Sequence, residues 1–105
     1  MPKGILVVES SPEGADRDRE YNEWYDGTHI GEICAIPGVT GARRYRLHGT
    51  EGDVPTYLAV YDLEADDLGA PLVEMAQRSA DGRLSPPKAL RLDPPPVVKI
   101  FELLD

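Results

Sequence analysis

Runs of apolar, β-branched and aromatic residues alternate along this chain with segments of helical periodicity and with clusters of turn-forming residues. Short runs of this kind that end at Gly, Pro, Asp or Ser are typical of β-strands. Apolar positions that recur every three or four residues predict helices. The expected strands are residues 3–10, 39–47, 56–63 and 97–103, and the expected helices are residues 16–35 and 64–80.

Local signals indicate where the first helix begins and ends. Asp16 is a candidate N-cap, because its side-chain oxygen can accept a hydrogen bond from a free backbone N–H. Gly27 is expected to divide the helix into residues 16–26 and 28–35, since glycine is a poor helix former. The Pro-Gly pair at 37–38 is expected to stop it.

A long connection rich in proline follows the second expected helix. Asp66 or Asp67 is the expected cap of that helix, and Pro71 lies near its first turn, where proline is tolerated. Residues 81–96 contain a Pro-Pro pair and a Pro-Pro-Pro run, which predict an extended conformation. Connections of this length in compact domains often bind ligands or partners.

The order of the elements predicts the fold. A β-α-β-β-α-β order indicates a ferredoxin-like α+β domain with an antiparallel four-stranded sheet, in which the first and third strands are central. The length fits a single domain over residues 1–105.

The strands are apolar on both faces. Successive side chains point to opposite sides of a strand, so Ile5 and Val7 share one face while Leu6 and Val8 share the other. Two helices can cover only one face of such a sheet. A second copy of the sheet is the simplest cover for the other face, which predicts a homodimer. The alternative is a monomer whose second face is partly shielded by residues 81–96.

Charge and cysteine content limit the classes of partner that the chain is expected to bind and indicate its cell compartment. The net charge of −8 disfavours binding to nucleic acid or to an anionic membrane surface, and no apolar run approaches the ~20 residues of a membrane span. The cluster Arg43, Arg44 and Arg46 lacks an aromatic platform and is interpreted as solubilising charge at a sheet edge. A lone cysteine, Cys34, and a start without signal-peptide character predict a cytoplasmic protein.

The densest group of chemically useful side chains lies in the first helix. Tyr21, Tyr25 and His29 are four residues apart, and Trp24 and Thr28 lie beside them on a continuous helix. A row of rings with polar tips suits a flat, partly polar ligand. Histidine exchanges protons near neutral pH. The alternative is that these rings are plain core, as aromatic residues at helical spacing often are.

Other chemistry has little support. His29 and Glu32 form an H-x-x-E pair, but two ligands are too few for a metal site, so no metal is expected. Cys34 is interpreted as a small buried apolar residue rather than a nucleophile. No glycine-rich phosphate loop precedes a helix.

Three blocks of the sequence resemble EthD-like proteins of the dimeric α/β-barrel superfamily. They lie within residues 3–63 and read Tyr21-Asn22-x-Trp24-Tyr25-Asp26-x-x-His29-Ile30-x-Glu32, Ile36-Pro37-Gly38-Val39-x-x-Ala42-Arg43-Arg44-Tyr45-Arg46 and Tyr57-Leu58-Ala59-Val60-Tyr61. Gly31 stands where family members often have proline, which leaves the direction of His29 open.

The resemblance implies a ferredoxin-like protomer, two of which face each other as a barrel, with a pocket between sheet and helices in each. The superfamily includes cofactor-independent monooxygenases, polyketide cyclases, isomerases, decarboxylases and haem enzymes, so the resemblance leaves the reaction open. No cofactor is expected here.

The leading hypothesis is a cofactor-free cyclase, isomerase or monooxygenase that acts on an aromatic or polyketide-like small molecule. His29 would serve as general acid or base, and Tyr25 would hydrogen-bond a carbonyl or enolate oxygen. Arg44 would hold an anionic group if its side chain faces the helices, and Tyr45 if the opposite register holds. The expected substrate-binding residues are Tyr21, Trp24, Thr28, Arg44, Tyr57 and Tyr61. The alternatives are a non-catalytic ligand carrier and a purely structural aromatic stripe.

Overall fold

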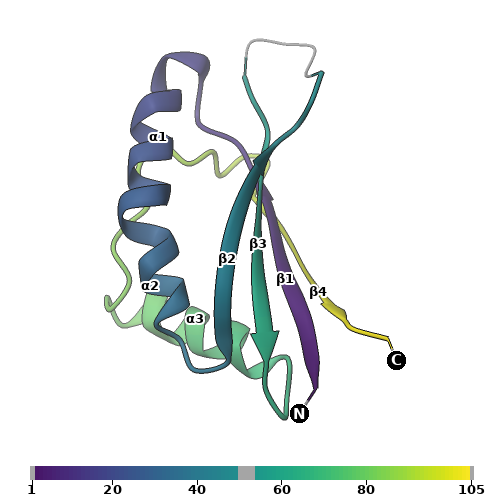
Figure 1. Cartoon of the computed structure of the whole chain (residues 1–105). Coiled ribbons are helices and arrows are strands. Elements are labelled where there is room, and N and C mark those ends of the chain that lie inside the picture. Colours follow the sequence, from purple (N-terminus) through teal and green to yellow (C-terminus); the bar gives the residue numbers. More distant parts are fainter. Residues whose placement is uncertain (1, 50–53, 105) are drawn as a thin grey trace.

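A computed structural model describes residues 2–49 and 54–104. The chain forms a four-stranded antiparallel sheet in the order β2-β3-β1-β4 (Figure 1). The expected ferredoxin-like topology with two central strands, β1 and β3, is therefore confirmed. The strands are β1 (Lys3–Ser10), β2 (Val39–Arg46), β3 (Tyr57–Glu64) and β4 (Val97–Glu102). Residues 50–53, between the second and third expected strands, lie outside the described residues.

The first helical segment is continuous rather than divided at Gly27. It comprises a 3-10 turn η1 (Ala15–Arg17), the helix α1 (Asp18–Trp24), a π-helical turn η2 (Tyr25–His29) and the helix α2 (Ile30–Cys34). Backbone hydrogen bonding continues through η2, so the expected division of the helix at Gly27 was wrong. Figure 1 shows α1 and α2 lying in one line.

The expected N-cap at Asp16 was also wrong. No side chain caps η1 or α1. Asp18, two residues later, uses its carboxylate to hold the helix to the sheet instead. Its Oδ1 accepts hydrogen bonds from the Tyr57 hydroxyl at 2.6 Å and from Asn22 Nδ2 at 3.1 Å. A contact between helix and sheet thus replaces a local cap.

The second helix, α3 (Ala70–Ala80), begins six residues later than the sequence predicts. The chain first makes a turn in which Asp67 Oδ1 accepts a hydrogen bond from the Gly69 N–H at 2.9 Å. Pro71 lies in the first turn of α3 as expected. A Cβ at Gly38, whose φ is +97°, would lie 3.0 Å from Pro71 Cγ, so only glycine fits where the first helix ends.

The core lies between the sheet and the helices. On the helix-facing side of the sheet, Leu6 and Tyr61 pair across β1 and β3 and are almost fully buried. The α1–α2 helix contributes mainly rings to this layer. The buried apolar residues are Leu6, Tyr21, Trp24, Tyr25, Ile33, Ile36, Val39, Tyr57, Ala59, Tyr61, Leu63, Leu68 and Ala89.

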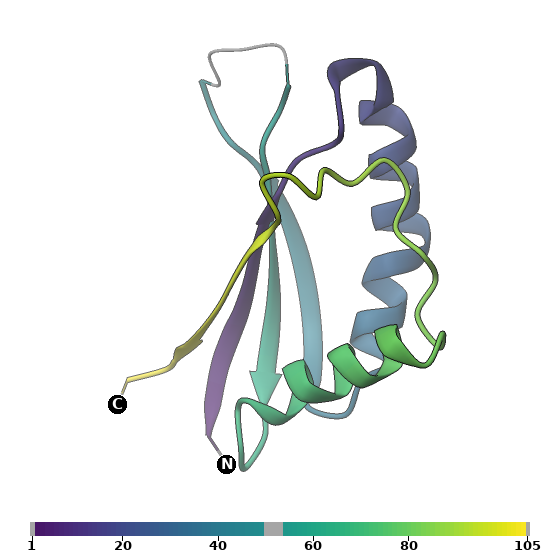
Figure 2. The ribbon, with the colours of Figure 1, turned by 180° about the vertical axis from the view of Figure 1, so that it is seen from behind.

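The other face of the sheet has no helix over it (Figures 1 and 2). Tyr45, Phe101 and Leu103 are 50%, 51% and 67% exposed on this side, while Val60 at its centre is already buried by its neighbours. Both faces therefore carry apolar side chains, as the strand pattern predicts. Within residues 2–49 and 54–104, no helix has the length and apolar character that crossing a bilayer requires.

Replacing Leu6 with alanine should lower the free energy of unfolding by about 3 kcal/mol, because it leaves a cavity in the centre of the core. Urea unfolding followed by far-UV circular dichroism measures the change. Leu92→Ala, at an exposed position, is the matched control and should change it by less than about 0.5 kcal/mol. Equal effects of the two substitutions would contradict the position of the core.

Candidate functional site

A cavity of about 320 Å³ lies between the sheet and the helices. The sheet and the α1–α2 helix form two of its walls, and α3 and the connection after it form the others. Ser10, His29, Ser79 and Ser85 are among its few polar residues. The lining residues are Val8, Ser10, Trp24, Tyr25, His29, Tyr61, Met75, Ala76, Ser79, Leu84, Ser85, Pro87, Leu90, Pro96 and Val98.

The wide turn η2 sets the direction of His29. Residues five apart lie about 140° apart around a regular α-helix and do not meet. In η2 the N–H of Ile30 bonds to the carbonyl of Tyr25, five residues earlier, so the helix is wider here. The imidazole of His29 consequently stacks on the indole of Trp24 at a centroid distance of 4.6 Å. It also packs edge-on against the ring of Tyr25, with the two ring centroids 4.8 Å apart.

Burial in this aromatic setting keeps His29 neutral. Desolvation lowers the pKa of His29 to about 4, with a further lowering by the positive charge of Arg44. The carboxylate of Glu32, one turn further along, opposes the shift. His29 Nδ1 is buried and has no hydrogen-bond partner among residues 2–49 and 54–104. His29 is therefore a neutral imidazole at physiological pH with an unused polar atom.

Two tyrosine hydroxyls meet in the same wall. Tyr61 donates a hydrogen bond to the hydroxyl oxygen of Tyr25 at 3.4 Å. Burial raises the pKa of Tyr25 to about 12 and raises the pKa of Tyr61 as well, so both stay protonated. Because Tyr25 accepts from Tyr61, its own hydroxyl hydrogen remains free to donate to a ligand oxygen.

Trp24 adds a second unused donor. Its indole Nε1 is buried without a hydrogen-bond partner in the part of the chain that the structure describes. Indole N–H groups usually find a partner when buried. The predicted residues Trp24, Tyr25, His29 and Tyr61 thus meet in one cavity wall.

The other predicted site residues do not line this cavity. Tyr21 is fully buried, with its hydroxyl 2.6 Å from Ser10 Oγ, and Tyr57 is tied to Asp18. Thr28 is half-buried on the helix. Tyr21 and Tyr57 pack on each other with their ring centroids 5.4 Å apart, and neither they nor Thr28 line the cavity.

Arg44 faces the helices, and Tyr45 lies on the open face, which settles the register that the sequence left open. The guanidinium carbon of Arg44 lies 4.2 Å from the ring centroid of Tyr25 and within 5.4 Å of two further tyrosine rings. Its Nη1 pairs with Asp26 at 2.9 Å. Cation–π contacts of this kind hold rings in place, so Arg44 braces the wall that carries Tyr25.

The sequence did not single out the residues that α3 and the connection contribute. Met75 and Ser79 line the cavity from α3, and Ser85, Pro87 and Leu90 line it from the connection. The length and proline content of residues 81–96 were the only signal for the latter group. No cluster of three or more His, Cys, Asp or Glu side chains suited to a metal occurs within residues 2–49 and 54–104.

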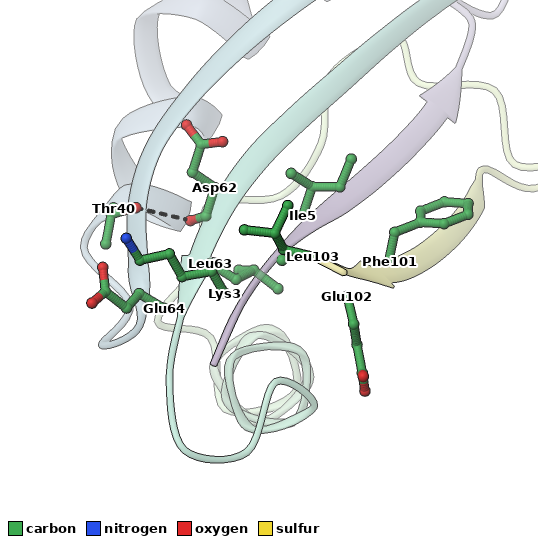
Figure 3. A pocket seen from close by; sticks show the side chains of 10 residues that line it. Lys3, Ile5, Thr40, Asp62, Leu63, Glu64, Phe101, Glu102 and Leu103 are labelled. Atoms are coloured by element: carbon green, nitrogen blue, oxygen red, sulfur yellow. Dashed lines mark hydrogen bonds between the residues drawn. The ribbon is translucent and has the colours of Figure 1, made fainter. Parts of the chain in front are cut away.

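A second hollow, of about 470 Å³, lies on the open face of the sheet (Figure 3). Ile5, Leu63, Phe101 and Leu103 supply its larger apolar side chains, and Lys3 and Glu64 are among the charged residues around it. No histidine, tyrosine or cysteine lines it. The hollow therefore offers apolar area without a group that exchanges protons near neutral pH.

Stability should depend on pH through His29. In the unfolded chain His29 has its ordinary pKa of 6.5, whereas in the folded chain the pKa is about 4. Between pH 6.5 and about pH 4 the unfolded state binds a proton that the folded state does not. The free energy of unfolding therefore has its full value above pH 6.5 and falls as the pH is lowered towards about 4. Urea unfolding near neutral pH and at about pH 4.5 should show this loss, and His29→Gln should reduce it. His48→Gln, at an exposed histidine, should leave the loss unchanged; an identical pH dependence in His29→Gln would refute the assignment.

Comparison with known proteins was informative only at the level of structure. No family model matches the chain, and no curated protein matches it. The chain is similar to a dimeric ferredoxin-like protein from an uncultured marine organism, with a TM-score of 0.61 and 10% identity, over 100% of this chain and 98% of that one.

Two further solved structures are similar to the chain. An ethyl tert-butyl ether D (EthD) family protein from Bacillus halodurans has a TM-score of 0.57 and 15% identity, over 96% of this chain and 99% of that one. The monooxygenase ActVA-Orf6 of Streptomyces coelicolor, solved with the ligand nanaomycin D, has a TM-score of 0.51 and 19% identity, over 97% of this chain and 88% of that one. The chain therefore has the ferredoxin-like α+β fold to which the EthD resemblance of its sequence pointed.

Proposed function

We propose that the chain binds a flat aromatic or polyketide-like small molecule in the cavity between sheet and helices, and that His29 acts on it as a general base. One observation carries the proposal. A neutral imidazole and a phenol with a free hydrogen, on His29 and Tyr25, share the wall of an otherwise apolar cavity.

The lining of the cavity supports this class of ligand. Its volume of about 320 Å³ lies at the lower end of the range of roughly 300–1,000 Å³ for small-molecule sites. Rings, aliphatic chains and prolines make up most of the wall, and they offer area to a flat apolar molecule. Trp24 and Tyr25 supply the few donors that would fix its orientation. The ActVA-Orf6 monooxygenase, which is similar in fold, was solved with nanaomycin D.

The chemistry that fits is removal of a proton from an acidic ring C–H or O–H. The proton moves to a nitrogen of His29, and the electron pair left behind develops as negative charge on a ligand oxygen. Tyr25 donates its hydroxyl hydrogen to that oxygen. The Glu32 carboxylate offsets part of the burial that disfavours the imidazolium. This deprotonation is the shared first step of cyclisation, isomerisation and oxygen addition to an activated ring.

A non-catalytic carrier is the second candidate. The low pKa of His29, about 4, makes the imidazole a weak base. A protein that only binds its ligand would use the same wall, with the donors of Trp24 and Tyr25 as its specificity groups.

His29→Gln should separate the two. If His29 is the base, the rate with naphthols or anthrones that bind to the cavity should fall by about 100-fold or more, while binding of the same compounds changes little. Product formation followed by liquid chromatography and mass spectrometry gives the rate, and quenching of Trp24 fluorescence gives the affinity. His48→Gln is the matched control. Equal turnover in the variant and the parent would exclude His29 as the base, and tight binding without turnover in the parent would favour the carrier.

We further propose that two copies pack through the open faces of their sheets. Phe101 and Leu103 are exposed there without a cover, and the hollow beside them can receive side chains from a second sheet. Lys3 and Glu64 at its border offer opposite charges for pairing between copies. The dimeric ferredoxin-like protein that is similar in fold supports this arrangement.

Phe101→Asp should convert the dimer to a monomer, because it buries a charge in the proposed interface. Light scattering after size-exclusion chromatography should give twice 11.5 kDa for the parent and 11.5 kDa for the variant. Val73→Asp, an exposed apolar position on α3, should remain dimeric. A parent protein that is monomeric at micromolar concentration would contradict the dimer proposal and would leave the ligand-binding proposal unaffected.

A further inference from the structure

The connection after α3 closes one side of the cavity without belonging to a helix or to the sheet. In Figure 2 it leaves α3, runs alongside the α1–α2 helix and crosses to β4. Residues 84–91 of this connection, here called the strap, contribute Leu84, Ser85, Pro87 and Leu90 to the lining. The strap packs on the core through Leu84, Ala89 and Leu90, and hydrogen bonds fasten it at its two ends.

Glu32 holds the first end. The Ser85 backbone N–H donates to both oxygens of the Glu32 carboxylate, at 3.1 and 3.0 Å, and the Ser85 hydroxyl donates to Oε2 at 3.0 Å. These atoms are 53 residues apart in sequence. Hydrogen bonds to a charged acceptor are stronger than those between neutral groups. The Leu84 N–H adds one bond to the carbonyl of Arg78 at 3.1 Å.

Backbone hydrogen bonds and the burial of Ala89 hold the second end. The carbonyl of Ala89 accepts from the Glu13 N–H at 2.7 Å, and the Arg91 N–H donates to the carbonyl of Ser11 at 3.0 Å. Ala89 is buried in the core cluster. Hydrogen bonds lie at and beside a buried residue at this end, whereas the first end depends on one carboxylate. The second end is therefore expected to detach less readily than the first.

The part between the ends is stiff and exposed. Pro86 and Pro87 have no N–H to donate and favour an extended conformation, and Lys88 beside them is exposed. Gly82, which has a φ of +83°, lies between α3 and the strap. Glycine adopts such angles at little cost, so backbone rotation is easiest there.

We propose that the strap is a cover over the cavity that opens at Ser85, and that Glu32 is the positioning residue that sets how often it opens. The proposal rests on the small-molecule site proposed above and adds its route of entry. Glu32 lies one turn beyond His29 on the same helix. The residue that fastens the cover is therefore built into the element that carries the proposed base.

The sole tryptophan reports on the cover without any ligand. Because Trp24 lines the cavity, acrylamide should quench its fluorescence weakly while the strap is closed. Glu32→Ala should raise the quenching constant at least about twofold, and Ser85→Ala, which keeps the backbone N–H, should raise it less. Glu23→Ala removes an exposed carboxylate that pairs with Arg19 on the same helix and should have no effect. Far-UV circular dichroism checks folding, and Ser85→Ala keeps the test open if Glu32→Ala does not fold.

A hydroxynaphthoquinone as probe tests passage into the cavity. In stopped-flow quenching of Trp24, the association and dissociation rates should both rise by about tenfold in Glu32→Ala, with a smaller change in the dissociation constant. Acrylamide quenching and probe rates that match the parent in both variants would overturn the cover. Increased acrylamide quenching in a protein that binds neither the quinone nor other flat aromatics would support the cover and count against the proposed function.

Discussion

The widening of the first helix at Tyr25–His29 is the constraint on which the site depends. A regular α-helix would point Trp24 and His29 in different directions, whereas the wider turn stacks one ring on the other. Each such ring contact contributes about 0.5–1.5 kcal/mol beyond the area it buries, which helps to offset the poorer hydrogen bonding of a π turn. The stack fixes His29 in the cavity wall, and with it the burial that keeps the imidazole neutral.

Much of the fold was readable from the sequence because side-chain alternation in strands is a strong local signal. Both boundaries of β1 were predicted correctly, and the boundaries of the other strands were predicted to within one residue. Helix boundaries were less accurate, since they depend on which hydrogen-bond partner an aspartate side chain takes. Asp18 bonds to Tyr57 across the core, so the helix starts without a side-chain cap at Asp16. At α3 the partner is local: Asp67 Oδ1 accepts a hydrogen bond from the Gly69 N–H, two residues later, and this turn precedes the helix.

The site was predicted only in part, and the difference lies in side-chain direction. Spacing correctly grouped Tyr25 and His29, but it treated Tyr21 as their equal, although Tyr21 is buried against Ser10. Equal spacing groups all three residues only on a helix of constant pitch, and nothing in the local composition indicates the π turn at Tyr25–His29. Length and proline content marked residues 81–96 as a connection that could bind a ligand, but they did not indicate which residues of the strap line the cavity. The strap residues have no periodicity, and the bond from Ser85 to Glu32 joins positions that no sequence pattern connects.

Closure and basicity make opposite demands on His29. A strap that closes fully over a bound ligand would keep water out of the cavity, which would strengthen the hydrogen bond that Tyr25 can offer to a developing oxyanion. The same exclusion of water lowers the pKa of His29 and weakens it as a base. Glu32 affects both properties, because its carboxylate accepts the hydrogen bonds of Ser85 and its negative charge also favours the imidazolium form of His29. Opening the strap would admit water and make His29 more basic, so His29 is the stronger base before closure and Tyr25 the better donor after it. A substrate that keeps its acidic proton until the strap has closed must therefore be acidic enough to be deprotonated by a weakly basic imidazole, which favours phenol-like and doubly activated ring protons over simple ketones.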